Sequence, residues 1–301
     1  MLHQASILVP VYNEEHALRA NMPRLLAFLE EALDDFEVLV VENGSRDNTL
    51  QVARSLSESS SRISVHSLPE ASLGQAIKAG LQAASFEKVV CFPIDLSVGL
   101  DFILEAVKLL DSFHIVVGSK RMAAGLDSRP LPRRMASRAY HGSVALLFHS
   151  QLSDTSCVKA FRRTKILDLL KAIPSNNSVF ETELLLAAEE LGLNIVEVPV
   201  QVSDSRRGRI PLALKAWSKA RDLFSLRVDS LSLYFGGLCL VSGLALMVWL
   251  VLQKLVSGRG GFSHPYSFLL ALLLVLFGAQ SVFFGFNSRL LLQLRGGHWV
   301  D

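Results

Sequence analysis

Two uncharged apolar stretches near the C-terminus constrain the fold of this chain more than any other feature. Residues 231–252 and residues 266–287 contain no Asp, Glu, Lys or Arg. Each stretch is about 22 residues, or roughly 33 Å as an α-helix, against a bilayer hydrocarbon core of about 30 Å. A buried helix of this length in a soluble protein would usually be interrupted by charged residues. The sequence therefore predicts a membrane-spanning hairpin over residues 230–301 rather than two core helices.

The charges that flank the two stretches predict their orientation. The loop that joins them, residues 253–265, holds only Lys254 and Arg259. The outer flanks are richer in basic residues, which are Arg206, Arg207, Arg209, Lys215, Lys219, Arg221 and Arg227 before the first stretch and Arg289 and Arg295 after the second. Because cytosolic flanks carry the excess of Lys and Arg, both termini and the N-terminal domain are expected in the cytosol. We expect a prokaryotic cell membrane rather than the endoplasmic reticulum.

Composition limits the class of protein further. Half of the residues are hydrophobic and 19% are charged, and the net charge of +2 gives no general signal for nucleic-acid binding. Cys91, Cys157 and Cys239 are odd in number and scattered. This spacing indicates a reducing compartment rather than a disulfide framework.

Strand-like and helix-like patterns alternate along the N-terminal part. This order predicts an α/β fold, with a mostly parallel sheet that has helices on both faces. The expected strands are residues 6–11, 37–41, 63–67, 88–92 and 114–118, and the expected helices are residues 14–33, 47–57, 73–84 and 101–110. Ligands bind such sheets at the carboxyl ends of the strands. The polar residues at those ends are therefore candidates for one site, and they include Tyr12, Asn13, Glu14, Glu42, Asn43, Asp95, Ser119, Lys120 and Arg121.

Several segments at these positions resemble the motifs of one enzyme family. They are Pro-Val-Tyr-Asn-Glu-Glu at 10–15, Glu-Asn-Gly-Ser-Arg-Asp-Asn-Thr at 42–49, Gly-Gln-Ala at 74–76 with Gly80, Gly-Ser-Lys-Arg at 118–121, Phe-Glu-Thr-Glu-Leu-Leu at 180–185 and Glu-Val-Pro-Val at 197–200. They resemble, in order, the motifs of family 2 glycosyltransferases of the GT-A fold. With two spans behind the domain, the chain is similar to the polyprenyl-phosphate sugar synthases, of the dolichol-phosphate mannose synthase and bactoprenol glucosyltransferase types.

The resemblance implies an activity and its partners. The chain would transfer a hexose, with inversion, from a UDP- or GDP-sugar to a dolichyl or undecaprenyl phosphate at the cytosolic membrane face. The residues that it implies for catalysis are Asp95, Arg121, Arg138 and Asp154. Those that it implies for nucleotide-sugar binding are Pro10, Tyr12, Asn13, Glu14, Glu42, Asn43, Gly74, Arg206 and Arg209.

Two departures from the family motifs bear on the expected metal, Mg²⁺ or Mn²⁺. Glu42-Asn43 stands where the family has two aspartates, and Pro93-Ile94-Asp95 stands where it has Asp-x-Asp. Mg²⁺ often uses only one or two carboxylates and takes its other ligands from phosphates and water, so Asp95 alone could hold it. The alternative is that Asp95 only caps the end of a strand. A non-catalytic scaffold or regulator is accordingly the second hypothesis for the whole chain.

Residues 211–229 have the pattern of an interfacial amphipathic helix. One face carries Ala213, Trp217, Ala220, Phe224 and Val228, and another carries Lys215, Lys219 and Asp222. The alternative is a helix that packs on the soluble domain. The expected domains are therefore residues 1–210, 211–229 and 230–301.

Two further expectations concern Asp154 and the glycines of the first span. Asp154 could orient the donor sugar or the attacking group, or be an ordinary loop acid. Gly236, Gly237 and Gly243 allow helices to approach closely, which favours a homo-oligomer as a hypothesis.

Overall fold

The protein is described here by a computed structural model. It describes residues 3–122, 131–173, 175–176, 179–202, 212–257 and 265–296. The chain forms two compact units, Met1–Asp222 and Leu223–Asp301. The predicted boundary at residue 210 falls within residues 203–211, which lie outside the described residues.

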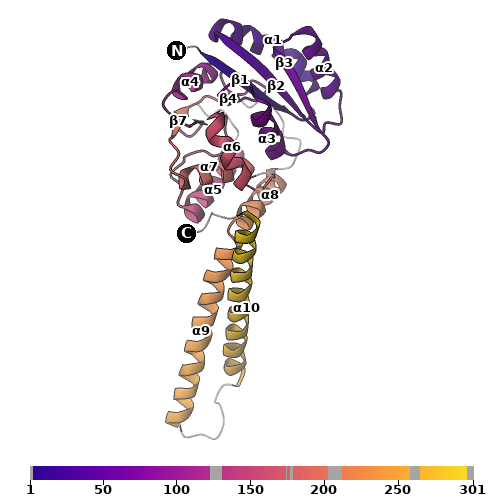
Figure 1. The fold of residues 1–301 in the computed structure, drawn as a ribbon. Helices are drawn as coiled ribbons and strands as arrows, with labels where there is room; N and C mark the ends of the chain where they lie inside the picture. The colour runs from indigo at the N-terminus through magenta and orange to yellow at the C-terminus, as the bar shows by residue number, and fades with distance from the viewer. Residues whose placement is uncertain are drawn as a thin grey trace. The chain divides into compact units, whose positions relative to one another are not determined.

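The first unit contains a seven-stranded sheet in the order β3-β2-β1-β4-β6-β5-β7 (Figure 1). β1 pairs in parallel with both β2 and β4, and β5 pairs in parallel with β7. β6 is antiparallel to both of its neighbours, so β4 and β5 run in the same direction. The predicted mostly parallel α/β sheet is confirmed. The strands are β1 Gln4–Val11, β2 Asp35–Asn43, β3 Ile63–Leu68, β4 Lys88–Cys91, β5 Ile115–Ser119, β6 Lys159–Arg162 and β7 Ile195–Pro199.

Helices connect the strands in the order expected for parallel pairing. The helices of the first unit are α1 Glu15–Ala32, α2 Thr49–Ser59, α3 Leu73–Ala83, α4 Asp101–Leu109, α5 Leu131–Phe148, α6 Arg163–Ala172 and α7 Phe180–Glu190. α8 Leu212–Ser225 crosses the boundary between the units.

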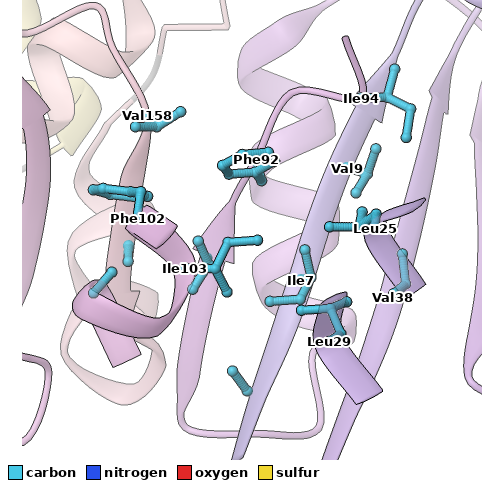
Figure 2. Close-up of a cluster of buried hydrophobic side chains, with 14 of the residues drawn as sticks. Ile7, Val9, Leu25, Leu29, Val38, Phe92, Ile94, Phe102, Ile103 and Val158 are labelled. Atoms are coloured by element: carbon cyan, nitrogen blue, oxygen red, sulfur yellow. The ribbon is translucent and has the colours of Figure 1, made fainter. Parts of the chain in front are cut away.

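The alternation of side chains along β1 explains how helices cover both faces of the sheet. Ile7 and Val9 belong to a buried cluster that includes Leu25 and Leu29 of α1, as Figure 2 shows. Phe102 and Ile103 of α4 complete this face of the core, next to Phe92 and Val158.

The opposite face of β1 packs against α3. Leu8 points there, and its Cδ1 would lie 2.1 Å from a Cβ placed on Gly80. Because successive strand residues face opposite sides, one strand supports both layers of helices. The backbone of α3 therefore lies directly on the sheet.

The second unit is a pair of long helices, α9 Val228–Ser257 and α10 Pro265–Gly296. Val228–Val256 and Tyr266–Leu290 are long and apolar enough to cross a membrane, and only 22% and 17% of their most apolar windows are buried. Core helices of a soluble protein would be mostly buried. The predicted membrane helices are therefore supported by their exposure as well as by their composition.

Glycines let α9 and α10 approach until their backbones touch. A Cβ on Gly236 would lie 2.8 Å from the carbonyl oxygen of Gly278, and a Cβ on Gly278 would lie 2.6 Å from the amide nitrogen of Leu240. Gly243 is similarly tight against α10, whereas Gly237 has nothing within 4 Å of its Cβ position. Two of the three glycines that suggested self-association thus serve the contact within the chain, and the homo-oligomer stays a prediction.

Candidate active site

The candidate site lies at the edge of the sheet where the parallel strands end. Val11 of β1 pairs with Glu42 of β2, so these two strands end side by side. β4 lies next to β1, and β5 runs in the same direction two strands further on. The residues that follow β1, β2, β4 and β5 are therefore brought to one edge, as the strand pattern predicts.

The turns after β1 and β2 are locked together through Asn13. The residue has a φ of +52°, a left-handed conformation that Asn tolerates better than most residues. Its backbone N–H donates to Ser45 Oγ at 2.9 Å, and its Oδ1 accepts from the backbone N–H of Arg46 at 2.7 Å. The N–H of Glu14 donates to Thr49 Oγ1 at 2.8 Å. These bonds fix the position of Tyr12, which follows Pro10 and Val11 and is 40% exposed beside the turn.

Glu42 and Asn43 are buried and hold neighbouring loops. Glu42 accepts hydrogen bonds on both carboxylate oxygens, from the backbone N–H of Ser45 and from Ser67 Oγ. Asn43 Oδ1 accepts from the backbone N–H of Ser72 at 2.7 Å. Both side chains therefore organise the loops that surround the site.

The N-terminus of α3 packs tightly against the segment before α7. A Cβ on Gly74 would lie 2.9 Å from the Cα of Asn176, so only glycine fits there without a shift. Lys78 lies one turn further along and donates through Nζ to the carbonyl oxygen of Ile173 at 2.8 Å and to Asn176 Oδ1 at 2.9 Å. Ser72 Oγ donates to the carbonyl oxygen of Asn176. These contacts determine the shape of the site beside Asn43.

Asp95 follows β4, between the ends of β1 and β5. It is half-buried, and its Oδ1 accepts from the backbone N–H of Ser97 at 2.9 Å. Val98 forms an antiparallel bridge with Val202. Val202, the last described residue before residues 203–211, is therefore paired with a residue only three positions after Asp95. Arg206 and Arg209, which the motifs predict as donor contacts, lie outside the described residues.

Asp154 is fully buried and contacts basic side chains from two elements. Its Oδ1 lies 3.2 Å from Nε2 of His141 on α5, and its Oδ2 lies 3.4 Å from Nζ of Lys120 after β5. Ser156 donates to Oδ1 through its backbone N–H at 2.9 Å. Burial raises the pKa of the Asp154 carboxyl, but His141 and the charge of Lys120 outweigh burial and hold this pKa below its usual value.

The loop that carries Asp154 is fixed from its other side by Glu197 of β7. The Glu197 carboxylate accepts from the backbone N–H groups of Ser153 and Asp154 and from Ser153 Oγ. Ser153 Oγ in turn lies 2.6 Å from the hydroxyl of the buried Ser119. The position of Asp154 is therefore determined by the sheet itself.

The predicted arginines occupy different settings. Arg121 is exposed, and its Nη1 donates to the carbonyl oxygen of Ser153 at 3.2 Å, so it lies beside the loop of Asp154. Arg138 is exposed on α5, one turn before His141. The contacts of Asp154 with Lys120 and His141 thus connect the two elements that carry these arginines.

No group of three or more His, Cys, Asp or Glu side chains within the described ranges could hold a metal ion. A lone carboxylate at the end of β4 still fits a Mg²⁺ or Mn²⁺ ion whose other ligands are phosphate and water oxygens.

A comparison with known protein families identifies the family of this domain. The family model described as glycosyl transferase family 2 matches residues 6–170. The chain belongs to glycosyl transferase family 2. The predicted family is thereby confirmed.

Two kinds of curated relative resemble this family 2 chain. Glycosyltransferase AglD of Haloferax volcanii is 33% identical over 65% of the chain, and the match covers 32% of AglD, so the chain spans about a third of that protein. An undecaprenyl-phosphate 4-deoxy-4-formamido-L-arabinose transferase of Edwardsiella ictaluri is 27% identical over 93% of the chain and 86% of the relative. The corresponding enzyme of Photorhabdus laumondii is 24% identical over 94% of the chain and 87% of the relative.

Solved structures confirm the GT-A fold of the family 2 domain. Glucosyl-3-phosphoglycerate synthase of Mycobacterium tuberculosis, solved with UDP, matches with a TM-score of 0.54 at 21% identity, over 74% of this chain and 79% of that one. The same enzyme with Mg²⁺ and UDP matches with a TM-score of 0.51 at 23% identity, over 74% and 78% of the two chains.

The sequence did not single out several residues that the structure brings into the site. His141 and Glu197 hold Asp154 and its loop, and Lys78 holds the segment beside α3. Glu197 lies in a family motif, but its partners could not be read from that motif. His141 and Lys78 have no local sequence signal, because their partners are distant in the chain.

Proposed function

We propose that this chain transfers a hexose from a nucleoside diphosphate sugar to a polyprenyl phosphate, dolichyl or undecaprenyl, with inversion at the anomeric carbon. The observation that carries the proposal is the match over more than nine-tenths of the chain, a share that must extend into both apolar helices, to enzymes named for undecaprenyl phosphate. A soluble transferase of the same family would need only the first unit. The two apolar helices therefore fit an acceptor that resides in a membrane.

The turns after β1 and β2 are our proposed nucleotide site. Pro10, Tyr12, Asn13 and Glu14 line the first turn, and the exposed ring of Tyr12 offers a surface on which a base can stack. We assign Glu42 and Asn43 to shaping this site, because their side-chain oxygens already accept bonds from Ser45, Ser67 and Ser72. Gly74 contributes by leaving room for the segment at Asn176.

The diphosphate of the donor would lie near Asp95. A Mg²⁺ or Mn²⁺ ion held by Asp95 and by the donor phosphates would neutralise the charge that develops on the leaving diphosphate. Arg206 and Arg209 follow Val202, which pairs with Val98 close to Asp95, so we propose that they contact the same diphosphate.

Attack by the acceptor needs no strong base. The second pKa of a phosphate monoester is about 6, so a polyprenyl phosphate is largely dianionic at neutral pH. Its oxygen forms the new bond to the anomeric carbon while the bond from that carbon to the diphosphate breaks. We propose that Arg121 and Arg138 hold the acceptor phosphate or the sugar phosphate. Asp154, which is fully buried and ion-paired, holds Lys120 and His141 and takes no proton.

We further propose that both termini and the catalytic unit lie in the cytosol. The support is the excess of Lys and Arg on the outer flanks of the two helices. We keep residues 1–210, 211–229 and 230–301 as the proposed domains.

A transfer assay tests the proposal. Purified full-length protein is incubated with Mg²⁺ or Mn²⁺, a polyprenyl phosphate and a panel of labelled UDP- and GDP-sugars that includes hexoses and a 4-amino-pentose derivative. We expect an acid-labile labelled lipid that Asp95→Ala abolishes and that Asp168→Ala, a change on the exposed surface of α6, preserves. A pentose product would show that the transferred sugar is a pentose and not a hexose. The absence of a product from every donor would favour the hypothesis of a non-catalytic scaffold, which is best supported by Pro93 in place of the family aspartate.

Metal binding is tested without turnover. We expect Mn²⁺, followed by electron paramagnetic resonance, to bind wild-type protein only when UDP is present, because one carboxylate cannot hold the ion without phosphate ligands. Asp95→Asn should remove this UDP-dependent binding. Tight Mn²⁺ binding without UDP would contradict the assignment of phosphate oxygens as the main ligands.

A further inference from the structure

An asparagine occupies a position on the apolar face of α1. The helix buries Leu18, Met22, Leu25 and Leu29 against the sheet. Asn21 lies three residues after Leu18 and four before Leu25, so it belongs to the same face, and it is half-buried there. Asn is an unfavourable residue inside a helix, because its amide competes with the backbone for hydrogen bonds. The polar side chain at this position therefore contributes something other than the stability of α1.

The partner of Asn21 is the segment that carries Asp95. Nδ2 of Asn21 donates to the carbonyl oxygen of Ile94 at 2.9 Å, although the two residues are 73 positions apart in the sequence. The side chain of Ile94 is buried in the cluster that also contains Val9 and Leu25 (Figure 2). The carbonyl group of Ile94 and the N–H of Asp95 belong to one planar peptide group. Asn21 therefore holds the peptide that leads directly into Asp95.

This peptide is the centre of a β-turn. The backbone N–H of Leu96 donates to the carbonyl oxygen of Pro93 at 3.2 Å, so Ile94 and Asp95 are the two central residues. Asp95 has a negative φ, whereas a type II turn needs a positive φ at the second central residue. Type I and type II turns differ by a flip of the central peptide. Because Asn21 binds the carbonyl oxygen of that peptide, it opposes the flip.

The backbone just after Asp95 is in a conformation that needs support from its surroundings. Leu96 has a φ of +50°, in the left-handed region that side chains of its kind seldom adopt. Its side chain packs against the buried cluster of the sheet, and the N–H of Ser97 donates to Oδ1 of Asp95. Backbone in such a conformation persists where neighbouring contacts determine it, and it is concentrated at functional sites. Asn21 supplies one of these contacts from α1.

We propose that Asn21 is a positioning residue: its amide fixes the orientation of the Ile94–Asp95 peptide and so sets the Asp95 carboxylate for a divalent cation and the donor diphosphate. The inference rests on the proposed function, in which Asp95 is the metal ligand. A site with one carboxylate depends strongly on the placement of that carboxylate, because no second one compensates for a shift. Side chains that orient a metal ligand typically contribute about 10- to 100-fold to metal affinity.

Hydrogen–deuterium exchange, resolved to single amides in full-length protein without metal, tests the hold on the turn. Asn21→Leu keeps the approximate shape of the side chain but removes the donor, and Asn21→Gln keeps an amide on a longer stem. Ala20→Leu, on the exposed side of the same helix, is the matched control. Circular dichroism verifies folding. We expect the amides of Leu96 and Ser97 to exchange about fivefold faster in Asn21→Leu, the factor for one lost hydrogen bond, and unchanged exchange would overturn the proposal.

Electron paramagnetic resonance of Mn²⁺ in the presence of UDP tests the consequence for the site. We expect Asn21→Leu to raise the Kd for Mn²⁺ by about tenfold or more, Ala20→Leu to match wild type and Asn21→Gln to lie between them. Faster exchange with an unchanged Kd would overturn the link between Asn21 and the Asp95 carboxylate. If wild type binds no Mn²⁺ with UDP, the proposed metal role of Asp95 fails, and the exchange rates alone decide whether Asn21 holds the turn.

Discussion

Replacing Asp154 with Asn distinguishes a carboxylate that holds the site together from one that takes part in the chemistry. The Asp154 side chain is fully buried, and its two partners, His141 and Lys120, have side chains that are 1% and 11% exposed. Removing one member of a buried ion pair typically costs about 3–5 kcal/mol, because the remaining charge has no partner. Asn keeps an oxygen that can accept from the Ser156 N–H, so we expect the lower end, about 3 kcal/mol.

The assay is thermal unfolding of the first unit in detergent, followed by circular dichroism. For a unit of this size, about 3 kcal/mol lowers Tm by roughly 6–12 °C. The exposed change Asp168→Asn should leave Tm unaltered, since its partner Lys171 is also at the surface. Adding Lys120→Met to Asp154→Asn should restore part of the loss, because the double variant no longer buries an unpaired ammonium group.

The dependence on pH follows from the direction of the Asp154 pKa. A carboxyl whose folded pKa lies below its unfolded value, about 3.9, adds stability that is fully present above that value and is lost as the pH falls through the folded pKa. The difference in Tm between wild type and Asp154→Asn should therefore be constant from about pH 5 to 8 and narrow only below about pH 4. An unchanged Tm together with lost transfer would refute the reasoning and make Asp154 a catalytic residue.

Other predictions test packing and the donor site. Gly80→Ala should lower stability by about 1–3 kcal/mol in denaturant unfolding, because its Cβ would overlap Leu8 of β1. Gly278→Val should open the α9–α10 pair and lower its resistance to proteolysis in detergent, whereas Gly237→Ala, whose added Cβ meets nothing, should behave as wild type. Glu42→Gln should raise the KM for the donor by about fivefold, the effect of roughly 1 kcal/mol from one weakened loop contact, with a smaller change in kcat. Equal losses of kcat and kcat/KM would instead place Glu42 at the reacting atoms.

The sequence predicted the parallel strands well, because each of them is a short apolar run that ends in polar residues. β6 was not predicted, although it lies inside the sheet, between β4 and β5. It is only Lys159–Arg162, and two of its four residues are basic. Lys159 is nevertheless buried, since its Nζ donates to Glu181 Oε1 of α7 and to the carbonyl oxygen of Cys157. A charge that is neutralised by a distant helix cannot be recognised from local hydrophobicity.

In the candidate site, too, contacts between residues that are distant in the sequence could not be predicted. Family motifs indicated candidate positions, and topology brought Asn13, Glu42, Asp95 and Arg121 to one edge of the sheet. Their individual roles depend on partners, and partners such as Ser67 for Glu42 come from other strands. The predicted roles of these residues therefore stay predictions until variants are measured.

The glycine contacts between α9 and α10 also determine how freely the membrane part of the chain can change during evolution. Positions 236, 243 and 278 meet the backbone or Cβ atoms of the other helix, so almost any other residue there separates the pair. The outward residues, such as Leu238 and Phe283, are exposed, and any side chain of sufficient hydrophobicity can replace them. Homologues should accordingly vary over most of both helices while they keep small residues at these few positions. In an alignment of homologues, the hairpin would then show little conservation of residue identity but clear conservation of small side-chain size at these positions.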